Sequence, residues 1–338
     1  MIQQFIRAVV GGNHLSREEA EAAMEQILTG QATPSQIAAL AVALRMKGET
    51  VDELAGFASV MRQKATHVPH QDPDVLDTCG TGGDGSNSFN ISTTVALVVA
   101  GAGVRVAKHG NRAMSSQAGS ADLLQQLGVK IDLDAAGVGR CIDEIGIGFM
   151  LAPAMHGAMK HAGPTRKEIG VRTFFNLLGP LSNPAGAKRQ LVGVFEGDFV
   201  EPVAAVLAQL GAERAWVVHG LDGLDELTTT DDTRVAEVKD GKVKSFYVSP
   251  QELGLELAEP KDLKGGDPAV NAALTLAVLK GEFGPRRDIV LLNAAAALVV
   301  AGKAASLKEG LPLAAQSIDS GNALGKLEDL KRLSNAGA

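Results

Sequence analysis

From residue 75 onward the chain alternates short apolar segments with longer helical patterns, and this alternation most restricts how it can fold. The apolar segments predict strands at residues 75–78, 104–107, 147–151, 189–195 and 215–219. The intervening segments predict helices at 91–100, 121–127, 135–145 and 200–210. A strand–helix–strand series favours parallel pairing, because each helix returns the chain to the same end of the sheet. The sequence therefore predicts an α/β fold with a mainly parallel central sheet, followed by a hairpin at 233–238 and 243–248.

The first 65 residues contain helical patterns only. At three helix starts a hydroxyl side chain is followed three positions later by a carboxyl or amide side chain, which is typical of a capped helix. These pairs are Ser16 with Glu19, Thr33 with Gln36 and Thr50 with Glu53. The tail from Pro268 onward is again helical in pattern. A small helical unit should therefore precede the α/β region.

Composition excludes several classes of function. The chain has 338 residues, 45% of them hydrophobic, which is enough for two domains of ~150 residues each. The formal charge of -7 argues against a general binder of nucleic acid or membrane surfaces. Aromatic residues make up 4% of the chain, too few for platforms on which nucleic-acid bases stack.

The chain shows no sign of export or membrane insertion. Its N-terminus has no long apolar stretch with a small-residue cleavage site, so no signal peptide is predicted. The longest apolar run, residues 95–103, is too short to cross a bilayer. Cys79 and Cys141 lack the spacing of a zinc site or a disulfide framework. We therefore expect a cytoplasmic protein.

Residues 79–93, CGTGGDGSNSFNIST, lie between a predicted strand and a predicted helix. Glycines let the backbone approach an anion, and the next helix N-terminus offers free N–H groups to a phosphate. The stretch from Gly80 to Gly85 also fits the dinucleotide pattern GxGxxG. That fold needs an acidic residue about 20 positions on, and none lies between Asp84 and Asp122. No Walker A lysine follows, and an ordinary tight turn does not explain the small and polar residues beyond the turn.

A second polar loop, residues 108–116, follows the next predicted strand, and a third element spans Gly119 to Asp122. Both lie at strand-to-helix junctions, where α/β proteins bind ligands. They bring cationic side chains and hydroxyls toward the glycine-rich loop. A solvated basic loop is the alternative for residues 108–112 alone. Together the loops indicate a ligand with several phosphates.

An acidic turn from Asp222 to Glu226 follows the predicted strand 215–219 at its carboxyl end. Carboxylates repel a polyphosphate unless a cation lies between them, and Mg²⁺ binds a few carboxylates together with substrate phosphates. Without the glycine loops this segment would be interpreted as a solvated turn. With them the sequence predicts a magnesium site, and no His/Cys cluster indicates zinc.

These motifs resemble the anthranilate phosphoribosyltransferase family over nearly the whole chain. The similarity covers ALRMKGET, GTGGDGSNSFNIST, KHGNRAMSS, GSADLLQQLG, HAGPTRKEIGVRTFFNLLGPLSNPAG and HGLDGLDEL. The resemblance implies transfer of the phosphoribosyl group of phosphoribosyl pyrophosphate to the amine of anthranilate, with Mg²⁺, in tryptophan biosynthesis. Two departures, residues 228–232 after the acidic pair and Met114 where valine is usual, are expected to matter little.

The resemblance also implies which residues contact each ligand. Positions for phosphoribosyl pyrophosphate are Gly80, Gly83, Asp84, Ser88, Asn90, Ile91, Ser92, Thr93, Lys108, His109, Gly110, Asn111, Arg112, Ala113, Met114, Ser115, Ser116 and Ser120. Positions for anthranilate are Gly80, Asn111 and Arg166, and those for Mg²⁺ are Ser92, Asp225 and Glu226.

The family fold implies two domains. A small, discontinuous all-helical domain would comprise residues 1–70 and a helical segment around 167–182. A larger α/β domain, of the nucleoside phosphorylase/phosphoribosyltransferase-like type, would comprise residues 71–166 and 183–338. The active site would lie in the cleft between them. Pyrimidine nucleoside phosphorylases share this architecture and supply the alternative function. A non-catalytic nucleic-acid-binding relative is a third reading, although it should be basic and lack parts of the loops.

The implied reaction is a displacement at C1 of the ribose, in which pyrophosphate leaves and the amine arrives. No nucleophile or essential base is predicted, because an aromatic amine is already unprotonated at neutral pH. Cys79 is more typical of a buried structural cysteine, and His109 is open to two roles, accepting a proton or positioning. Arg166 offers a planar, two-pronged donor to the anthranilate carboxylate. Without its motif it would be taken for a solvated surface residue.

The predicted helix that follows Pro34 suggests how the chain assembles. Ile37, Leu40, Val42 and Leu44 lie on several of its faces. This is more apolar surface than a three-helix unit can bury alone, so one face should pair with its copy in a C2 homodimer. The family resemblance points the same way.

Overall fold

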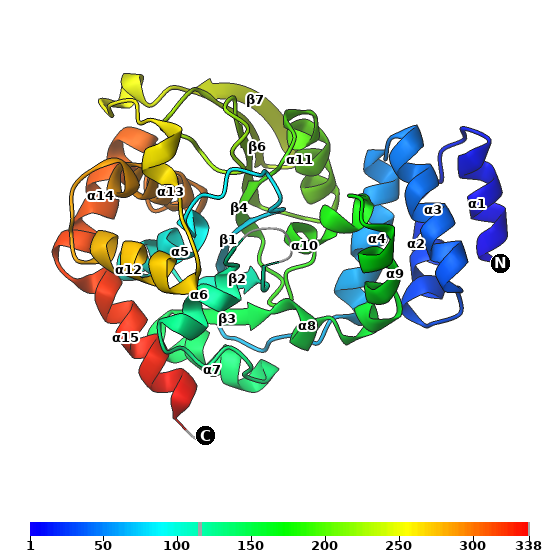
Figure 1. Ribbon diagram of the computed structural model, residues 1–338, viewed down its shortest axis with the longest axis horizontal. Coiled ribbons are helices and arrows are strands. Elements are labelled where there is room, and N and C mark those ends of the chain that lie inside the picture. The colour runs from blue at the N-terminus through cyan, green and yellow to red at the C-terminus, as the bar shows by residue number, and fades with distance from the viewer. Residues whose placement is uncertain (114–116, 337–338) are drawn as a thin grey trace.

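The computed structural model describes residues 1–113 and 117–336 (Figure 1). A helical bundle projects from one side of the molecule and contains α1 (Ile2–Val10), α2 (Arg17–Leu28), α3 (Pro34–Lys47) and α4 (Val51–Lys64). The three predicted helix starts are confirmed. The side chains of Ser16, Thr33 and Thr50 each accept a hydrogen bond from the backbone three residues on, and the acid or amide there bonds back.

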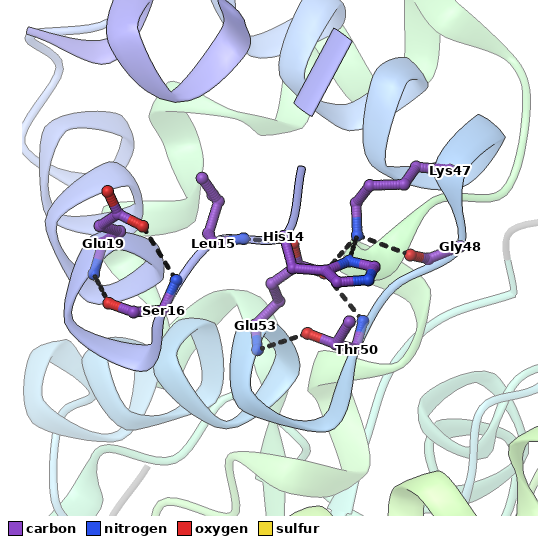
Figure 2. Close-up of polar contacts among 8 residues, drawn as sticks. All are labelled: His14, Leu15, Ser16, Glu19, Lys47, Gly48, Thr50 and Glu53. Atoms are coloured by element: carbon purple, nitrogen blue, oxygen red, sulfur yellow. Dashed lines mark hydrogen bonds and ion pairs between the residues drawn. The ribbon is translucent and has the colours of Figure 1, made fainter. Parts of the chain in front are cut away.

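Glu53 ties the start of α4 to the loops around it (Figure 2). Its carboxylate is fully buried and accepts hydrogen bonds from the backbone N–H of Leu15 at 2.9 Å and of Thr50 at 2.8 Å. Nζ of Lys47 donates to the same carboxylate at 2.9 Å and lies 2.8 Å from Nδ1 of His14. A buried carboxylate is stable only with several donors, so this set fixes the connection between α3 and α4.

The rest of the chain is built on a seven-stranded sheet within the described residues. Its strands are β1 (Leu76–Gly80), β2 (Val106–Gly110), β3 (Ile147–Leu151), β4 (Arg189–Gly193), β5 (Arg214–Gly220), β6 (Thr233–Lys239) and β7 (Lys242–Val248). The order is β3-β2-β1-β4-β5-β6-β7, in which β3 to β5 run parallel and β6 and β7 pair antiparallel. The predicted mainly parallel sheet and hairpin are confirmed.

Helices cover both faces of this sheet. One face carries α5 (Ile91–Gly101), α13 (Pro285–Val300), α14 (Leu307–Asp319) and α15 (Asn322–Asn335), and the other carries α11 (Val200–Gln209). Side chains alternate along each strand, so Leu191 and Val218 enter the first core while Val192 and Val217 enter the second. The second core continues into the bundle through α4, which packs on α11.

Three further helices complete the α/β part. They are α6 (Ser120–Gln126), α7 (Ala135–Ile145) and α12 (Pro268–Leu279). α7 packs against β3, and α12 packs against α6. No helix within the described residues has both the length and the apolar composition needed to cross a membrane.

The segment between β3 and β4 returns the chain to the bundle. It is broken into short turns: α8 (Ala152–Met155), η1 (Gly157–His161), α9 (Gly163–Ile169), η2 (Phe174–Asn176) and α10 (Leu178–Leu181). The structure therefore has several short helices where the sequence suggested a helical segment around 167–182. Gly170, in the left-handed conformation with φ +68°, ends α9. These turns pack on α2, α3 and α4.

Candidate active site

The carboxyl ends of β1, β2 and β5 lie at the same edge of the sheet, because these strands are parallel. The glycine-rich loop follows β1, the second polar loop starts within β2, and the acidic turn follows β5. Two hydrogen bonds join them directly. Nζ of Lys108 donates to the carbonyl oxygen of Thr78 at 2.6 Å, and the N–H of Gly82 donates to Oδ2 of Asp225 at 2.8 Å.

The conformation of the glycine-rich loop depends on its glycines. Gly82, Gly83 and Gly85 have φ angles of +64°, +79° and +79°, a region that glycine enters without strain. At Gly80 a Cβ atom would lie only 2.6 Å from Oδ2 of Asp225. Glycine at this position therefore allows the acidic turn to pack directly against the loop. An ordinary strand-to-helix turn would not need such close packing.

The start of α5 faces the same edge. Asn90, which precedes α5, donates from its side chain to the carbonyl oxygen of Ala118 at 3.1 Å. The backbone N–H of Ser92 donates to Oε1 of Glu226 at 3.1 Å, so a predicted metal position contacts another directly. The hydroxyl of Thr93 is buried without a hydrogen-bond partner in the described part of the chain. The side chain of Ile91 is buried in the core, which leaves only its backbone to face a ligand.

The second polar loop is braced by α6. The N–H of Asn111 donates to Oγ of Ser120 at 3.1 Å, and Oδ2 of Asp122 accepts from the N–H of Ala113 at 2.9 Å. Arg112 forms an ion pair with Asp122 at 2.8 Å, so its charge is already matched by a carboxylate. Met114, Ser115 and Ser116 lie outside the described residues.

One residue of each loop has a local structural role: Ser88 in the glycine-rich loop and Gly110 in the second polar loop. Ser88 forms an isolated antiparallel bridge with Lys264, which ties the loop to the segment before α12. At Gly110 a Cβ atom would lie 2.2 Å from Oγ of Ser120. A side chain at this position would therefore displace the hydroxyl that holds Asn111.

Three carboxylates, those of Asp84 in the glycine-rich loop and of Asp225 and Glu226 in the acidic turn, lie at this sheet edge. The N–H of Asp225 donates to Oδ2 of Asp84 at 3.3 Å, so the carboxylate of Asp84 lies beside the predicted metal residue Asp225. Burial, with repulsion from Asp84, raises the pKa of Asp225 to about 7. Burial, with repulsion from Asp225, also raises the pKa of Glu226. The negative charge of each carboxylate makes the charged form of its neighbour less favourable. A hard cation such as Mg²⁺ offsets this repulsion and stabilises the charged carboxylates.

This acidic group fits Mg²⁺ by its chemistry. Within the described residues no group of three or more His, Cys, Asp or Glu side chains is placed so that it could hold a metal ion. Mg²⁺ does not require one, because it is held by one or two carboxylates, with water and substrate phosphates as its other ligands. The donors available here are the Asp225 and Glu226 carboxylates and the hydroxyl of Ser92.

Two buried histidines lie beside the second loop. The ring centroids of His109 and His156 are 5.1 Å apart, and Nδ1 of His109 lies 3.2 Å from the carbonyl oxygen of Gly179. Burial lowers the pKa of His109 to about 3 and that of His156 to about 4. Both rings are therefore neutral at pH 7, and His109 is a poor proton acceptor. Between the two roles left open by the sequence, this favours positioning.

These histidines should weaken the fold in mild acid. An unfolded imidazole takes up a proton below its pKa of about 6.5, whereas the folded His156 ring stays neutral down to about pH 4. The unfolded state binds more protons in this window, so the free energy of unfolding falls as the pH falls. His156→Gln should reduce the loss between pH 7 and pH 5 by about 1.5–2 kcal/mol, at ~1.4 kcal/mol per pH unit. Urea denaturation at both pH values measures it; an unchanged difference would contradict a buried, neutral ring.

Arg166 lies on α9, in the segment that returns the chain to the bundle. Its guanidinium carbon is 5.1 Å from the ring centroid of Phe175, and burial lowers its pKa. No carboxylate of the described residues forms an ion pair with it. An arginine that is partly buried and lacks a carboxylate is available to an anionic ligand.

Several residues that support the site were not found from the sequence. Asp77, buried on β1, accepts hydrogen bonds from the N–H of His109 at 3.1 Å and from Nδ2 of Asn183 at 2.8 Å. Asn271 on α12 donates to Oδ1 of Asn90 at 2.9 Å. An acid within an apolar strand was an available signal for Asp77. Nothing in the sequence pairs Asn271 with Asn90.

Residues 228–232, where the sequence departs from the family pattern, adjoin the acidic turn and brace it. Oδ2 of Asp222 accepts hydrogen bonds from the hydroxyls of Thr228, at 2.8 Å, and Thr230. The buried amide of Asn293 on α13 bonds to both backbone groups of Leu227, at 3.0 and 2.7 Å. Leu227 directly follows Glu226, so these contacts hold the predicted metal residues in place.

Comparison with known proteins agrees with this architecture. The family described as glycosyl transferase family, a/b domain, matches residues 72–324, and the glycosyl transferase family, helical bundle domain, matches residues 3–65. The chain thus has both parts of a glycosyl transferase, the helical bundle and the a/b domain.

Individual relatives of the chain belong to one kind of glycosyl transferase. The chain is 54% identical to anthranilate phosphoribosyltransferase of Symbiobacterium thermophilum, over 99% of this chain and 98% of that protein. It is 58% identical to the enzyme of Afipia carboxidovorans, over 98% of each. The structure of the Thermus thermophilus enzyme has a TM-score of 0.93 at 46% identity, covering 98% of this chain and 99% of that one. The chain belongs to the anthranilate phosphoribosyltransferase family.

Proposed function

We propose that this protein transfers the phosphoribosyl group of phosphoribosyl pyrophosphate to anthranilate, giving N-(5-phosphoribosyl)anthranilate and pyrophosphate in tryptophan biosynthesis. The main observation in its support is that a glycine-rich loop and a buried acidic turn meet at one sheet edge. A Saccharomyces cerevisiae relative, with TM-score 0.90 and 29% identity over 99% of this chain and 98% of that one, is in complex with phosphoribosyl pyrophosphate and Mg. Anthranilate fluorescence should fall only when phosphoribosyl pyrophosphate and Mg²⁺ are both added.

In this proposal each loop has its own ligand. The N–H groups of the glycine-rich loop and the start of α5 bind the phosphates. Gly80, Asn111 and Arg166 contact anthranilate. Ser92, Asp225 and Glu226 hold Mg²⁺, which would offset the negative charge of the pyrophosphate. These assignments rest on the family motif and on the placement described above.

The reaction breaks the bond between C1 of the ribose and the pyrophosphate oxygen and forms a bond from C1 to the amine nitrogen. The amine loses one proton to water, and the pyrophosphate oxygen keeps the bonding electrons. Donors that face this oxygen stabilise its growing charge. The aromatic amine needs no prior deprotonation, and His109, neutral and weakly basic, orients the loop that carries Asn111.

The division into domains is also proposed. The packing of α9, η2 and α10 on α3 and α4 supports a discontinuous helical domain made of residues 1–70 and the segment around 167–182. Residues 71–166 and 183–338 would form the α/β domain, with the active site between the two. A cytoplasmic location also stays a prediction.

We further propose a homodimer formed through the helical domain. Ile37, Leu40 and Leu44 do not supply its surface, because they are buried within the protomer, where α1 packs on α3. The exposed apolar residues of these helices are Met1, Val10, Val42 and Met46, which are 84%, 71%, 36% and 83% exposed. Val42 and Met46 lie four positions apart and share a face of α3, and exposed apolar side chains of this kind favour self-association. Light scattering at micromolar protein should give twice the monomer mass; a monomeric mass would contradict this.

Arg166→Ala should separate anthranilate binding from phosphoribosyl pyrophosphate binding. Hydrogen bonds to a charged group contribute about 1.5–3 kcal/mol, so the KM for anthranilate should rise roughly 10- to 100-fold. The KM for phosphoribosyl pyrophosphate should change little. Steady-state kinetics with each substrate varied in turn measure both constants.

Aniline, which lacks the carboxylate, is the matched control. It should be a poor acceptor for the wild-type protein and should lose little more in Arg166→Ala. Equal losses with both acceptors would mean that Arg166 acts structurally. A pyrimidine nucleoside phosphorylase would instead cleave uridine or thymidine with phosphate and ignore anthranilate, so that result would overturn the proposed function.

A further inference from the structure

Arg172 joins the helical segment to the glycine-rich loop. It lies between α9 and η2 and is exposed, and its guanidinium carbon is 4.5 Å from the ring centroid of Phe195. Its Nη2 atom would be 3.1 Å from a Cβ atom at Gly83. The guanidinium therefore lies directly over the backbone of the loop, at a residue whose positive φ turns the loop N–H groups.

The charge of Arg172 is not matched by a carboxylate. Within residues 1–113 and 117–336 it forms no ion pair. Asp84, next to Gly83, accepts instead from the N–H groups of Ser86 at 3.1 Å and Asp225 at 3.3 Å. Glu196, next to Phe195, is paired with Arg45 at 3.3 Å. The acids next in the chain to Gly83 and Phe195, the two residues that Arg172 lies against, are thus engaged elsewhere.

Phe195, the ring over which Arg172 lies, is itself held to the glycine-rich loop. The backbone N–H of Phe195 donates to Oγ1 of Thr81 at 3.0 Å, and Phe195 is 7% exposed. A guanidinium stacked on an aromatic ring keeps its planar edge free for hydrogen bonds. Stacking therefore holds the cation over Gly83 without neutralising it, which suits an anion bound by the loop.

We propose that Arg172 binds the diphosphate of phosphoribosyl pyrophosphate from the side of the helical segment, opposite the glycine-rich loop. This inference rests on the proposed function. It divides the two unpaired arginines of one segment between two anions: Arg166, over Phe175, serves the carboxylate of the acceptor, and Arg172, over Phe195 and Gly83, serves the diphosphate. When the bond to C1 breaks, the diphosphate gains charge, so Arg172 acts on turnover as well as on binding.

Arg172→Ala tests this directly. Losing a charged two-pronged donor should raise the Kd for phosphoribosyl pyrophosphate, measured by calorimetry with Mg²⁺ and without anthranilate, by roughly 10- to 100-fold. The Kd for inorganic pyrophosphate should rise by a similar factor, and kcat should fall. The KM for anthranilate should change less than about threefold, well short of one tenfold step. Arg172→Lys, which keeps the charge but not the planar fork, should recover part of the loss.

Arg166→Ala is the matched control, because it removes an unpaired arginine from the same segment and should leave the pyrophosphate Kd unchanged. Normal binding of both diphosphates by Arg172→Ala would overturn the inference and leave Arg172 as packing on Phe195. A second result would also overturn the inference. It is that Arg172→Ala and Arg172→Lys both have lower melting temperatures and that both bind phosphoribosyl pyrophosphate and anthranilate more weakly by the same factor. Absence of anthranilate turnover in the wild type, with tight pyrophosphate binding that still depends on Arg172, would count against the proposed function alone.

Discussion

Replacing Asp225 with asparagine should lower kcat by roughly 100-fold or more, the scale for losing one group that stabilises transition-state charge. Asparagine keeps an oxygen for the N–H of Gly82 but removes one of the negative charges proposed to hold Mg²⁺. The fold should survive. In the metal-free protein this carboxylate is buried beside Asp84, which raises its pKa to about 7, so removing its charge relieves repulsion. Turnover at saturating Mg²⁺ and the metal-free melting temperature measure both effects.

Asp231→Asn is the control for this experiment. Asp231 lies six positions further along, is exposed, and carries the same charge. It should keep wild-type turnover. If Asp225→Asn also turned over normally, Asp225 would not hold the metal. If the metal-free melting temperature of Asp225→Asn fell sharply, the Asp225 carboxylate would instead contribute to the stability of the fold.

Gly83→Ala should weaken phosphoribosyl pyrophosphate binding by roughly 100-fold or more, the equivalent of losing two charge-assisted hydrogen bonds at about 1.5–3 kcal/mol each. Gly83 has φ +79°, and a Cβ atom there would lie 3.1 Å from the guanidinium of Arg172. To place a methyl group, the loop has to turn its N–H groups away or displace Arg172. Either change removes donors from the diphosphate, as calorimetry with Mg²⁺ would measure.

Gly254→Ala controls for the cost of the backbone conformation. Gly254 also has φ +79°, ends the short helix η4 (Gln251–Leu253) and has no atom within 4 Å of an added Cβ. Both variants should lose a similar stability, about 1–2 kcal/mol for a left-handed residue with a side chain. Only Gly83→Ala should lose binding. Normal binding in Gly83→Ala would make the loop a structural turn only.

Much of the fold could be predicted because its signals are local. The capping boxes at Ser16, Thr33 and Thr50 involve atoms three residues apart, and the structure contains each of them. The strand and helix series from residue 75 appears with boundaries shifted by only a few residues. Once the strands are known to be parallel, the strand-end loops must meet at one edge, so the region of the site follows as well.

Where long-range packing decides, the sequence was insufficient. Ile37, Leu40, Val42 and Leu44 were expected to be more than the bundle could bury, but the structure buries Ile37, Leu40 and Leu44 and leaves only Val42 of the four exposed, four positions before the exposed Met46. Apolar periodicity shows which residues avoid water, not which neighbour buries them. Likewise the resemblance implied a helical segment around 167–182, but only the structure shows that it consists of the short elements α9, η2 and α10.

The sequence by itself determined the elements of this protein, the glycine-rich loop and the acidic turn, because capping, periodicity and turn chemistry depend on residues close along the chain. Only the tertiary structure decided their chemistry. Asp225 meets Gly82 across 143 positions and Asp84 across 141, and His109 meets a second buried ring in His156. Arg172 rests over Gly83. A pKa, a close approach or an unmatched charge depends on burial and on which groups surround it in space, and that arrangement exists only once the chain has folded.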